Sequence, residues 1–192
     1  MEYADTKIAK LSKGMVQRLS VAQAMMGSPE VLILDEPMIG LDPAGSAHFR
    51  EVFREFASQK GGTVFMSSHI MSEVESLCTS VAIIHAGRIL YHGKVVDVIQ
   101  KVLDYSVIYL EAQGLTDQTI GKIREIASVS KIVPNGDSLE IIVQGHTDVR
   151  PDISDLVVKS GAKLYSIRQA ENMLERAYIE ALSKSNSGQW TI

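Results

Sequence analysis

The sequence is poor in cysteine and has no long hydrophobic run. Its single cysteine, Cys78, excludes an intrachain disulfide and cannot form a zinc site by itself. We interpret Cys78 as a small apolar residue on a helix face. No apolar stretch approaches the roughly 20 residues of a membrane-spanning helix, and Met1–Asp5 lacks the basic and hydrophobic regions of a signal peptide. We therefore expect no direct membrane insertion, so that any association with a membrane depends on a partner.

Basic charge is also scarce. Nineteen Lys and Arg residues stand against 23 Asp and Glu residues, which gives a formal net charge of −4 at pH 7. This balance gives no reason to expect a polyanion-binding surface, so we do not expect nucleic acid as a direct partner. The 192 residues, 45% of them hydrophobic, are enough for one large or two small globular domains with a true core.

The most informative stretch that is present runs from Val31 to Pro37. Four consecutive large apolar residues predict a strand buried on both faces of a parallel sheet. Asp35 and Glu36 follow at its carboxyl end, where open α/β sheets place their chemistry. Two carboxylates at that position need a cation, a metal ion or hydrogen-bond donors. The alternative is that Asp35 only caps the following turn, but the neighbouring stretches favour a functional interpretation.

Two helix starts flank this predicted strand. Ser12 is a suitable N-cap for a helix that ends at about Met26, and such an N-terminus can hold a phosphate group, although it is more often an ordinary core helix. Asp42 is the expected N-cap of a second helix that begins at Pro43. The predicted buried stripe of this second helix consists of Phe49, Val52, Phe53 and Phe56.

A second strand is predicted at Thr63–Ser67, with Ser68 and His69 at its carboxyl end. If it lies parallel to the first strand, the polar residues that follow both strands lie on the same sheet edge. A hairpin then joins Val81–His85 to Arg88–His92 across Ala86-Gly87.

The pattern changes at about Tyr105. Predicted strands and helices then follow the order βαββαβ, which is the order of a ferredoxin-like domain. Residues 134–137 form the predicted tight turn between the second and third of these strands. We expect a linker helix over 94–104, this domain over 105–182 with a terminal helix from Glu171, and a loose tail over 183–192.

Four motifs in a fixed order resemble the nucleotide-binding domain of ATP-binding cassette (ABC) proteins. They are Leu11–Met15 (signature loop), Leu32–Glu36 (Walker B strand), Gly40–Pro43 (D-loop) and Ser67–His69 (switch histidine), and the resemblance covers roughly residues 5–93. It implies an α/β fold, part of a P-loop NTPase (RecA-like) parallel sheet with flanking helices, over residues 1–93.

The resemblance also implies a site for ATP and Mg²⁺. Asp35 would hold Mg²⁺ through water, Glu36 would polarise the attacking water, and His69 would contact the γ-phosphate. Ser12, Lys13, Gly14 and Asp42 would reach the nucleotide bound by the opposite subunit of a head-to-tail dimer. This set of groups suits phosphoryl transfer, which depends on positioning and charge neutralisation.

Two departures from the commonest signature are similar to those of exporter ATPases. Lys13 replaces a glycine and Met15 a glutamine, and the C-terminal extension with Leu174–Tyr178 is loosely similar to that of exporters of drugs, antibiotics or polysaccharides. The implied partners are a membrane permease and a second nucleotide-binding domain. The implied location is cytoplasmic, peripheral on the inner face of the cell membrane.

A third departure is an absence. The phosphate-binding loop G-x-x-x-x-G-K-[ST] has no counterpart, because Gly40 and Gly45 have the glycine spacing but Ser46-Ala47 follow them. Only ten residues precede Leu11, so we expect the C-terminal part of a cassette, inactive in ATP hydrolysis by itself. The alternatives are a non-transport cassette ATPase and an interaction or regulatory module without catalysis.

Overall fold

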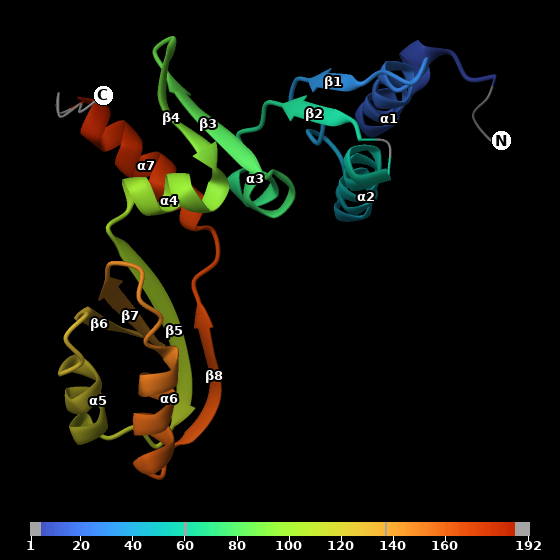
Figure 1. Cartoon of the computed structure of the whole chain (residues 1–192). Coiled ribbons are helices and arrows are strands. Elements are labelled where there is room, and N and C mark those ends of the chain that lie inside the picture. The colour runs from blue at the N-terminus through green and yellow to red at the C-terminus, as the bar shows by residue number, and fades with distance from the viewer. Residues whose placement is uncertain (1–4, 60, 137, 187–192) are drawn as a thin grey trace. The chain divides into compact units, whose positions relative to one another are not determined.

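The structure is a computed structural model that describes residues 5–59, 61–136 and 138–186 (Figure 1). The chain forms two compact units, which divide between Cys78 and Thr79. The helices are α1 (Lys13–Ala24), α2 (Pro43–Gln59), α3 (Met71–Leu77), α4 (Val95–Val102), α5 (Asp117–Arg124), α6 (Arg150–Lys159) and α7 (Met173–Asn186), with a 3-10 helix at Ile8–Lys10. The strands are β1 (Val31–Leu34), β2 (Thr63–Met66), β3 (Ser80–His85), β4 (Arg88–Lys94), β5 (Tyr105–Gln113), β6 (Val129–Asn135), β7 (Ser138–Gln144) and β8 (Lys163–Gln169).

In the first unit, β1 and β2 form a parallel pair, as predicted. Their register runs from Val31 opposite Thr63 to Leu34 opposite Met66. One face of this pair packs against α1 and α2. The buried residues of the resulting core are Val21, Met38, Phe49 and Phe53.

The other face of β1 and β2 is bare, so the prediction that Val31–Leu34 is buried on both faces was wrong. The exposed fractions are 52% for Val31, 78% for Ile33 and 66% for Phe65, whereas Leu32 is buried. Successive side chains of a strand point to opposite faces, and the described residues cover only one of them. The continuous apolar run thus indicated a strand that could be covered on both faces. In the described part of this unit, only one face is covered.

Local signals around α1 and α2 agree with the sequence. Ser12 caps α1 by accepting the Met15 N–H at 3.3 Å, and Asp42 caps α2 by accepting the Gly45 N–H at 2.8 Å. The predicted stripe of α2 faces the interior of the unit, because Phe49, Phe53 and Phe56 are buried and Val52 is partly buried. Gly62 closes the turn after α2, where a Cβ would lie 2.2 Å from the Phe56 ring.

In the second unit, the four strands β5 to β8 form an antiparallel sheet in the order β6-β7-β5-β8. Helices α5 and α6 cover one face of this sheet (Figure 1). The predicted βαββαβ order is therefore observed, with the first and third strands at the centre of the sheet.

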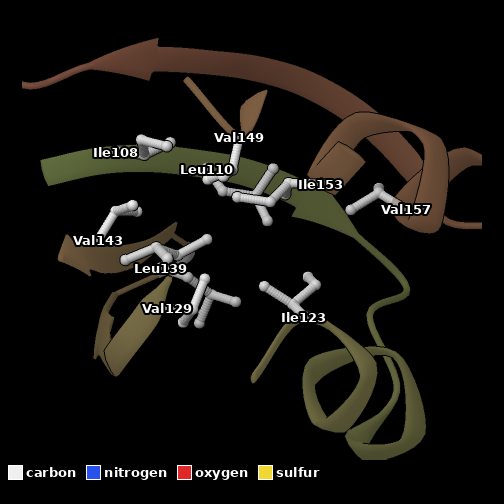
Figure 2. Close-up of a cluster of buried hydrophobic side chains, with 10 residues drawn as sticks. Ile108, Leu110, Ile123, Val129, Leu139, Val143, Val149, Ile153 and Val157 are labelled. Atoms are coloured by element: carbon white, nitrogen blue, oxygen red, sulfur yellow. The ribbon is translucent and has the colours of Figure 1, made fainter. Parts of the chain in front are cut away.

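The core between this sheet and its two helices is well filled. Figure 2 shows its side chains, which come from β5, β6, β7, α5 and α6. Its buried members are Ile108, Leu110, Ile123, Val129, Leu139, Ile141, Val143, Val149, Ile153 and Val157. Such burial makes this the better-packed part of the chain.

A second cluster in the same unit joins the β3–β4 hairpin to α4, α7 and the opposite face of β5. It includes Ile83 of the hairpin, Val98 of α4, Val107 of β5 and Ala177 of α7. The hairpin turn at Ala86-Gly87 has positive φ at both residues, as a two-residue turn between twisted strands requires.

The break in packing lies before the boundary that we drew from the sequence. We placed the end of the first domain at Gly93, whereas the hairpin from Thr79 onward belongs to the second compact unit because it shares a core with α4 and α7. That residues 79–93 belong to a nucleotide-binding domain stays a prediction from the resemblance. Helix α7 continues to Asn186, into the expected tail. Residue 137 of the predicted turn and tail residues 187–192 lie outside the described residues.

Candidate functional site

The carboxyl ends of β1 and β2 bring polar side chains together. The two strands are in register at their ends, where the Ser67 N–H donates to the Leu34 carbonyl at 3.0 Å. The Ser67 hydroxyl donates to Asp35 Oδ1 at 2.5 Å and accepts the Glu36 N–H at 2.9 Å. One serine therefore links the side chain of the first carboxylate to the backbone of the second.

The side chains of Glu36 and His69 are hydrogen-bonded to each other at these strand ends. His69 Nδ1 lies 2.8 Å from Glu36 Oε1. The side chain of His69 is 66% exposed and that of Glu36 is 29% exposed. Both groups are thus positioned by each other and still accessible to a ligand from solvent.

Glu36 has an unusual backbone conformation. Its φ is +44°, in the left-handed region, which costs a residue with a Cβ on the order of 1–3 kcal/mol. Three hydrogen bonds hold the backbone there: its N–H donates to Ser67 Oγ, and its carbonyl accepts from the Ile39 N–H at 3.1 Å and from Gln17 Nε2 at 3.3 Å. Strain maintained at a carboxylate beside a histidine is typical of functional sites.

A second patch forms where the N-termini of α1 and α2 meet. A Cβ on Gly14 would lie 3.2 Å from the Gly40 carbonyl oxygen, and one on Gly40 would lie 3.0 Å from Lys13 Cδ. Arg18 of α1 pairs with Asp42 at 3.4 Å. Lys13, Gly14 and Asp42 thus lie near the capped end of α1, together with Ser12.

The two patches are separate in their contacts. Within the described part of the chain, no hydrogen bond or ion pair joins Ser12, Lys13, Gly14 or Asp42 to the side chains of Asp35, Glu36 or His69. The link between them is structural, because Gln17 of α1 donates to the carbonyls of Glu36 and Pro37 at 3.3 and 2.9 Å.

The groups at the strand ends fit a hard cation better than a transition metal. Over residues 5–59, 61–136 and 138–186, no three His, Cys, Asp or Glu side chains gather closely enough to hold a metal ion. Asp35 is exposed, and the Ser67 hydroxyl lies against its Oδ1. Mg²⁺ needs few protein ligands because it keeps several waters and binds substrate phosphates, so a carboxylate beside a hydroxyl suits it.

Two residues of this arrangement had no role in the sequence analysis. Ser67 was placed in the second strand and in the Ser67–His69 motif but had no role of its own, although its position directly after four strand residues is a signal that it reaches the same edge as Asp35. Gln17 gave no such signal, because its acceptors are 19 and 20 residues away along the chain. Contacts of that separation follow from packing and not from local pattern.

None of the helices in the described residues combines the length and apolar character needed to cross a bilayer.

Comparisons with known proteins point in one direction. The sequence family described as ABC transporter matches residues 1–39. An uncharacterized ABC transporter ATP-binding protein of Synechocystis is 34% identical over 176 residues, which are 92% of this chain and 46% of that protein. The linearmycin resistance ATP-binding protein LnrL of Bacillus subtilis is 30% identical over 96% of this chain and 60% of its own length.

The bacitracin transport ATP-binding protein BcrA of Bacillus licheniformis is 33% identical over 94% of this chain and 58% of its own length. The chain therefore spans about half the length of the curated relatives that it matches. The similarity extends across both compact units, since each alignment includes more than nine tenths of the chain.

Proposed function

Because the chain belongs to the ABC transporter ATP-binding proteins, we propose that it carries the hydrolytic carboxylates of an ATP-hydrolysing subunit that energises an exporter. The observation that carries this proposal is the contact between Glu36 and His69 beside Asp35 and Ser67. An exporter is proposed because two relatives are named for linearmycin resistance and for bacitracin transport.

In this proposal Glu36 orients and deprotonates the attacking water. Its backbone is held by Ser67 and Gln17, so the carboxylate has a defined position before a substrate arrives. His69 is mostly exposed and can contact the transferred phosphate while its Nδ1 stays on Glu36. Asp35 and Ser67 would hold Mg²⁺, which would neutralise charge on the phosphate oxygens.

The patch at the N-terminus of α1 would serve a different nucleotide. Within the described residues, no hydrogen bond or ion pair joins Ser12, Lys13, Gly14 or Asp42 to the side chains of Asp35, Glu36 and His69. The positive end of the α1 dipole lies at Ser12. We propose that this patch contacts ATP held by a second nucleotide-binding domain in a head-to-tail dimer. The remaining partner is a membrane permease, so that the assembled subunit lies on the inner face of the cell membrane.

A second candidate function is that of an interaction module without catalysis. The bare face of β1 and β2, with Val31, Ile33 and Phe65 exposed, favours it because such a surface suits another protein segment. The two functions differ in whether Glu36 matters for any reaction.

The test is a chimera in which the part of LnrL that precedes its alignment with this chain is joined to residue 1. The chimera should hydrolyse ATP with Mg²⁺, and Glu36→Gln should lower turnover by about 10²–10⁴-fold without loss of ATP binding. The matched control is Glu51→Gln on the exposed face of α2, and this variant should retain activity. The 192-residue chain alone should show no hydrolysis, because it has no phosphate-binding loop.

Wild-type turnover in the Glu36→Gln chimera would refute the assigned role. A chimera that folds and binds ATP but never hydrolyses it would favour the interaction module. Sustained phosphate release by the 192-residue chain, free of contaminating ATPase, would show that another segment replaces the absent loop.

A further inference from the structure

The second unit contains a small cavity that the proposed function does not use. Its volume is about 50 Å³. It lies between the start of β5, the end of β8 and the loop that leads into α6. Its polar lining residues are Ser106, His146, Thr147, Asp148, Arg150 and Gln169. Ile108, at one end of the core in Figure 2, forms its apolar wall.

Ser106 is the residue that points to a ligand. It shares the helix-covered face of β5 with Ile108 and is only 7% exposed. Its hydroxyl has no hydrogen-bond partner among the residues that the structure describes. The hydroxyl is not one of the fully enclosed polar atoms of the described residues, so although most of Ser106 is buried, the hydroxyl is still open to the space in the cavity. A group bound in the cavity could therefore accept a hydrogen bond from it in place of water.

Helix α6 begins at this cavity and adds the positive end of its dipole. Its N-cap, Val149, makes no side-chain cap, the Arg150 N–H donates to Asp148 Oδ1 at 3.1 Å, and Pro151 has no N–H. The helix therefore favours negative charge through its field more than through free donors.

The side chains around the cavity are mainly hydrogen-bond donors. Within the described ranges, the side chains of Thr147, His146 and Gln169 make no hydrogen bond, and each can donate one. The only carboxylate, Asp148, is engaged by Arg150, whose Nε lies 2.8 Å from Oδ1 and whose Nη2 lies 2.8 Å from Oδ2. Because this pair neutralises itself, Asp148 is a poor ligand for a cation, while Arg150 keeps further N–H groups.

We propose that this cavity binds a small oxyanion, with free inorganic phosphate as the ligand to test. The volume exceeds the share of one water in the liquid, about 30 Å³, and is far below the roughly 300 Å³ at which pockets begin to hold drug-sized molecules. The space therefore suits a small ion better than a whole nucleotide. All residues involved lie in the second unit, so the proposal is independent of ATP hydrolysis.

The experiment is an amide NMR titration of the 192-residue chain with inorganic phosphate, with chloride at matched ionic strength as the reference. Saturable shifts should be confined to the residues around Ser106 and the start of α6. Ser106→Ala should weaken phosphate affinity about three- to tenfold, the effect of one hydrogen bond. Ser130→Ala on β6, whose hydroxyl already donates to the Ile142 carbonyl, is the matched control and should leave affinity unchanged.

Asp148→Asn should tighten binding by about two- to fivefold, because it removes a like charge from an exposed site. Weaker phosphate binding by this variant would mean that Asp148 supports binding, by its own contact or by orienting Arg150, and would overturn its assignment as a repelling charge. Absence of saturable shifts in the wild type, or equal affinity in Ser106→Ala, would overturn the proposal.

O-phosphoserine and glycerol 3-phosphate distinguish a free ion from the phosphate of a peptide or a lipid headgroup. Both should bind more weakly than inorganic phosphate, because the cavity has no room for the ester group. Tighter binding of either would overturn the assignment to a free ion.

Discussion

The strands β1 and β5 are both strongly apolar, yet they lie in different surroundings. In the first unit, Val31 and Ile33 of β1 are exposed while Leu32 is buried. In the second unit, β5 buries Val107 on one face and Leu110 on the other. The difference arises because other elements cover β5 on both faces but cover β1 on only one face. Both strands are apolar enough to be buried, and the number of layers packed against each strand decides how much of it is buried.

The two units also differ in where the candidate site lies and in the size of their cores. The first unit holds Asp35, Glu36 and His69, a strained backbone at Glu36 and a core cluster with four buried members. The core of the second unit's four-stranded sheet has ten. Reactive groups and strain therefore coincide with the smaller core, as expected where a site must stay accessible.

The largest expected effect tests whether the residues at the N-terminus of α1 and the residues at the ends of β1 and β2 serve different nucleotides. In the LnrL chimera, Ser12→Arg should lower ATP hydrolysis about 10²-fold or more while ATP affinity of the isolated subunit is retained, because a bulky cation would prevent closure onto the partner's nucleotide. Hydrolysis and nucleotide binding are measured side by side. Ser20→Arg, on the exposed side of the same helix, should be active. Equal loss of affinity and activity in Ser12→Arg would contradict the assignment to a partner's nucleotide.

The next effect compares one residue type in the two units. Ile153 is fully buried in α6, whereas Ile33 is 78% exposed. Ile153→Ala should lower the free energy of unfolding of the second unit by about 2–5 kcal/mol, and Ile33→Ala should change stability by less than about 0.5 kcal/mol. Urea unfolding of the 192-residue chain, followed by far-UV circular dichroism, measures both. A large cost at Ile33 would show that the bare face is covered in solution.

A smaller effect concerns the helix cap in the first unit. Asp42→Ala removes the acceptor of the Gly45 N–H and should cost about 1 kcal/mol. Its exposed pair with Arg18 should add little. Asp42→Asn should keep most of the stability, because asparagine caps equally well, and urea unfolding compares the two variants. If asparagine were as harmful as alanine, charge and not capping would be the role of Asp42.

The smallest effect belongs to the second unit and depends on pH. Hydrogen bonds from Arg150 hold the pKa of Asp148 at about 2, below the ordinary value of about 3.9. A depressed pKa means that the stabilisation is present above about pH 4 and is lost as the pH falls to about 2. Because the pair is solvent-exposed, global stability should hardly change.

Carbon NMR titration of the Asp148 carboxyl group measures this pKa directly. In Arg150→Met the pKa should rise towards the ordinary value, and an unchanged low pKa would show that Arg150 is not the cause. The comparison also tests the self-neutralised pair on which the oxyanion proposal relies.

Much of the site's membership followed from the sequence. The pattern of an apolar run with two carboxylates, followed by a second strand and Ser68-His69, predicted that Asp35, Glu36 and His69 share one edge, and the parallel pairing of β1 with β2 brings them there. The role of the Ser67 hydroxyl, which links the Asp35 carboxylate to the backbone N–H of Glu36, was not predicted. Its position after the second strand indicated the sheet edge, but its two hydrogen bonds span 31 and 32 positions of sequence, and tertiary packing decided which groups they join.

The amino-acid sequence by itself determined the features that depend on near neighbours in the chain. These are the caps at Ser12 and Asp42, the turn at Ala86-Gly87, the order βαββαβ and the motifs that indicate the ABC family. Each cap, turn, strand, helix and motif is a short stretch of neighbouring residues, and the order of these stretches is read directly along the chain. Only the tertiary structure decided which apolar faces are covered, which unit the β3–β4 hairpin joins, how Glu36 is held at positive φ and that Ser106 lines a cavity. Those features depend on contacts between residues far apart in sequence, whose formation is set by how layers pack and not by the pattern within any one element.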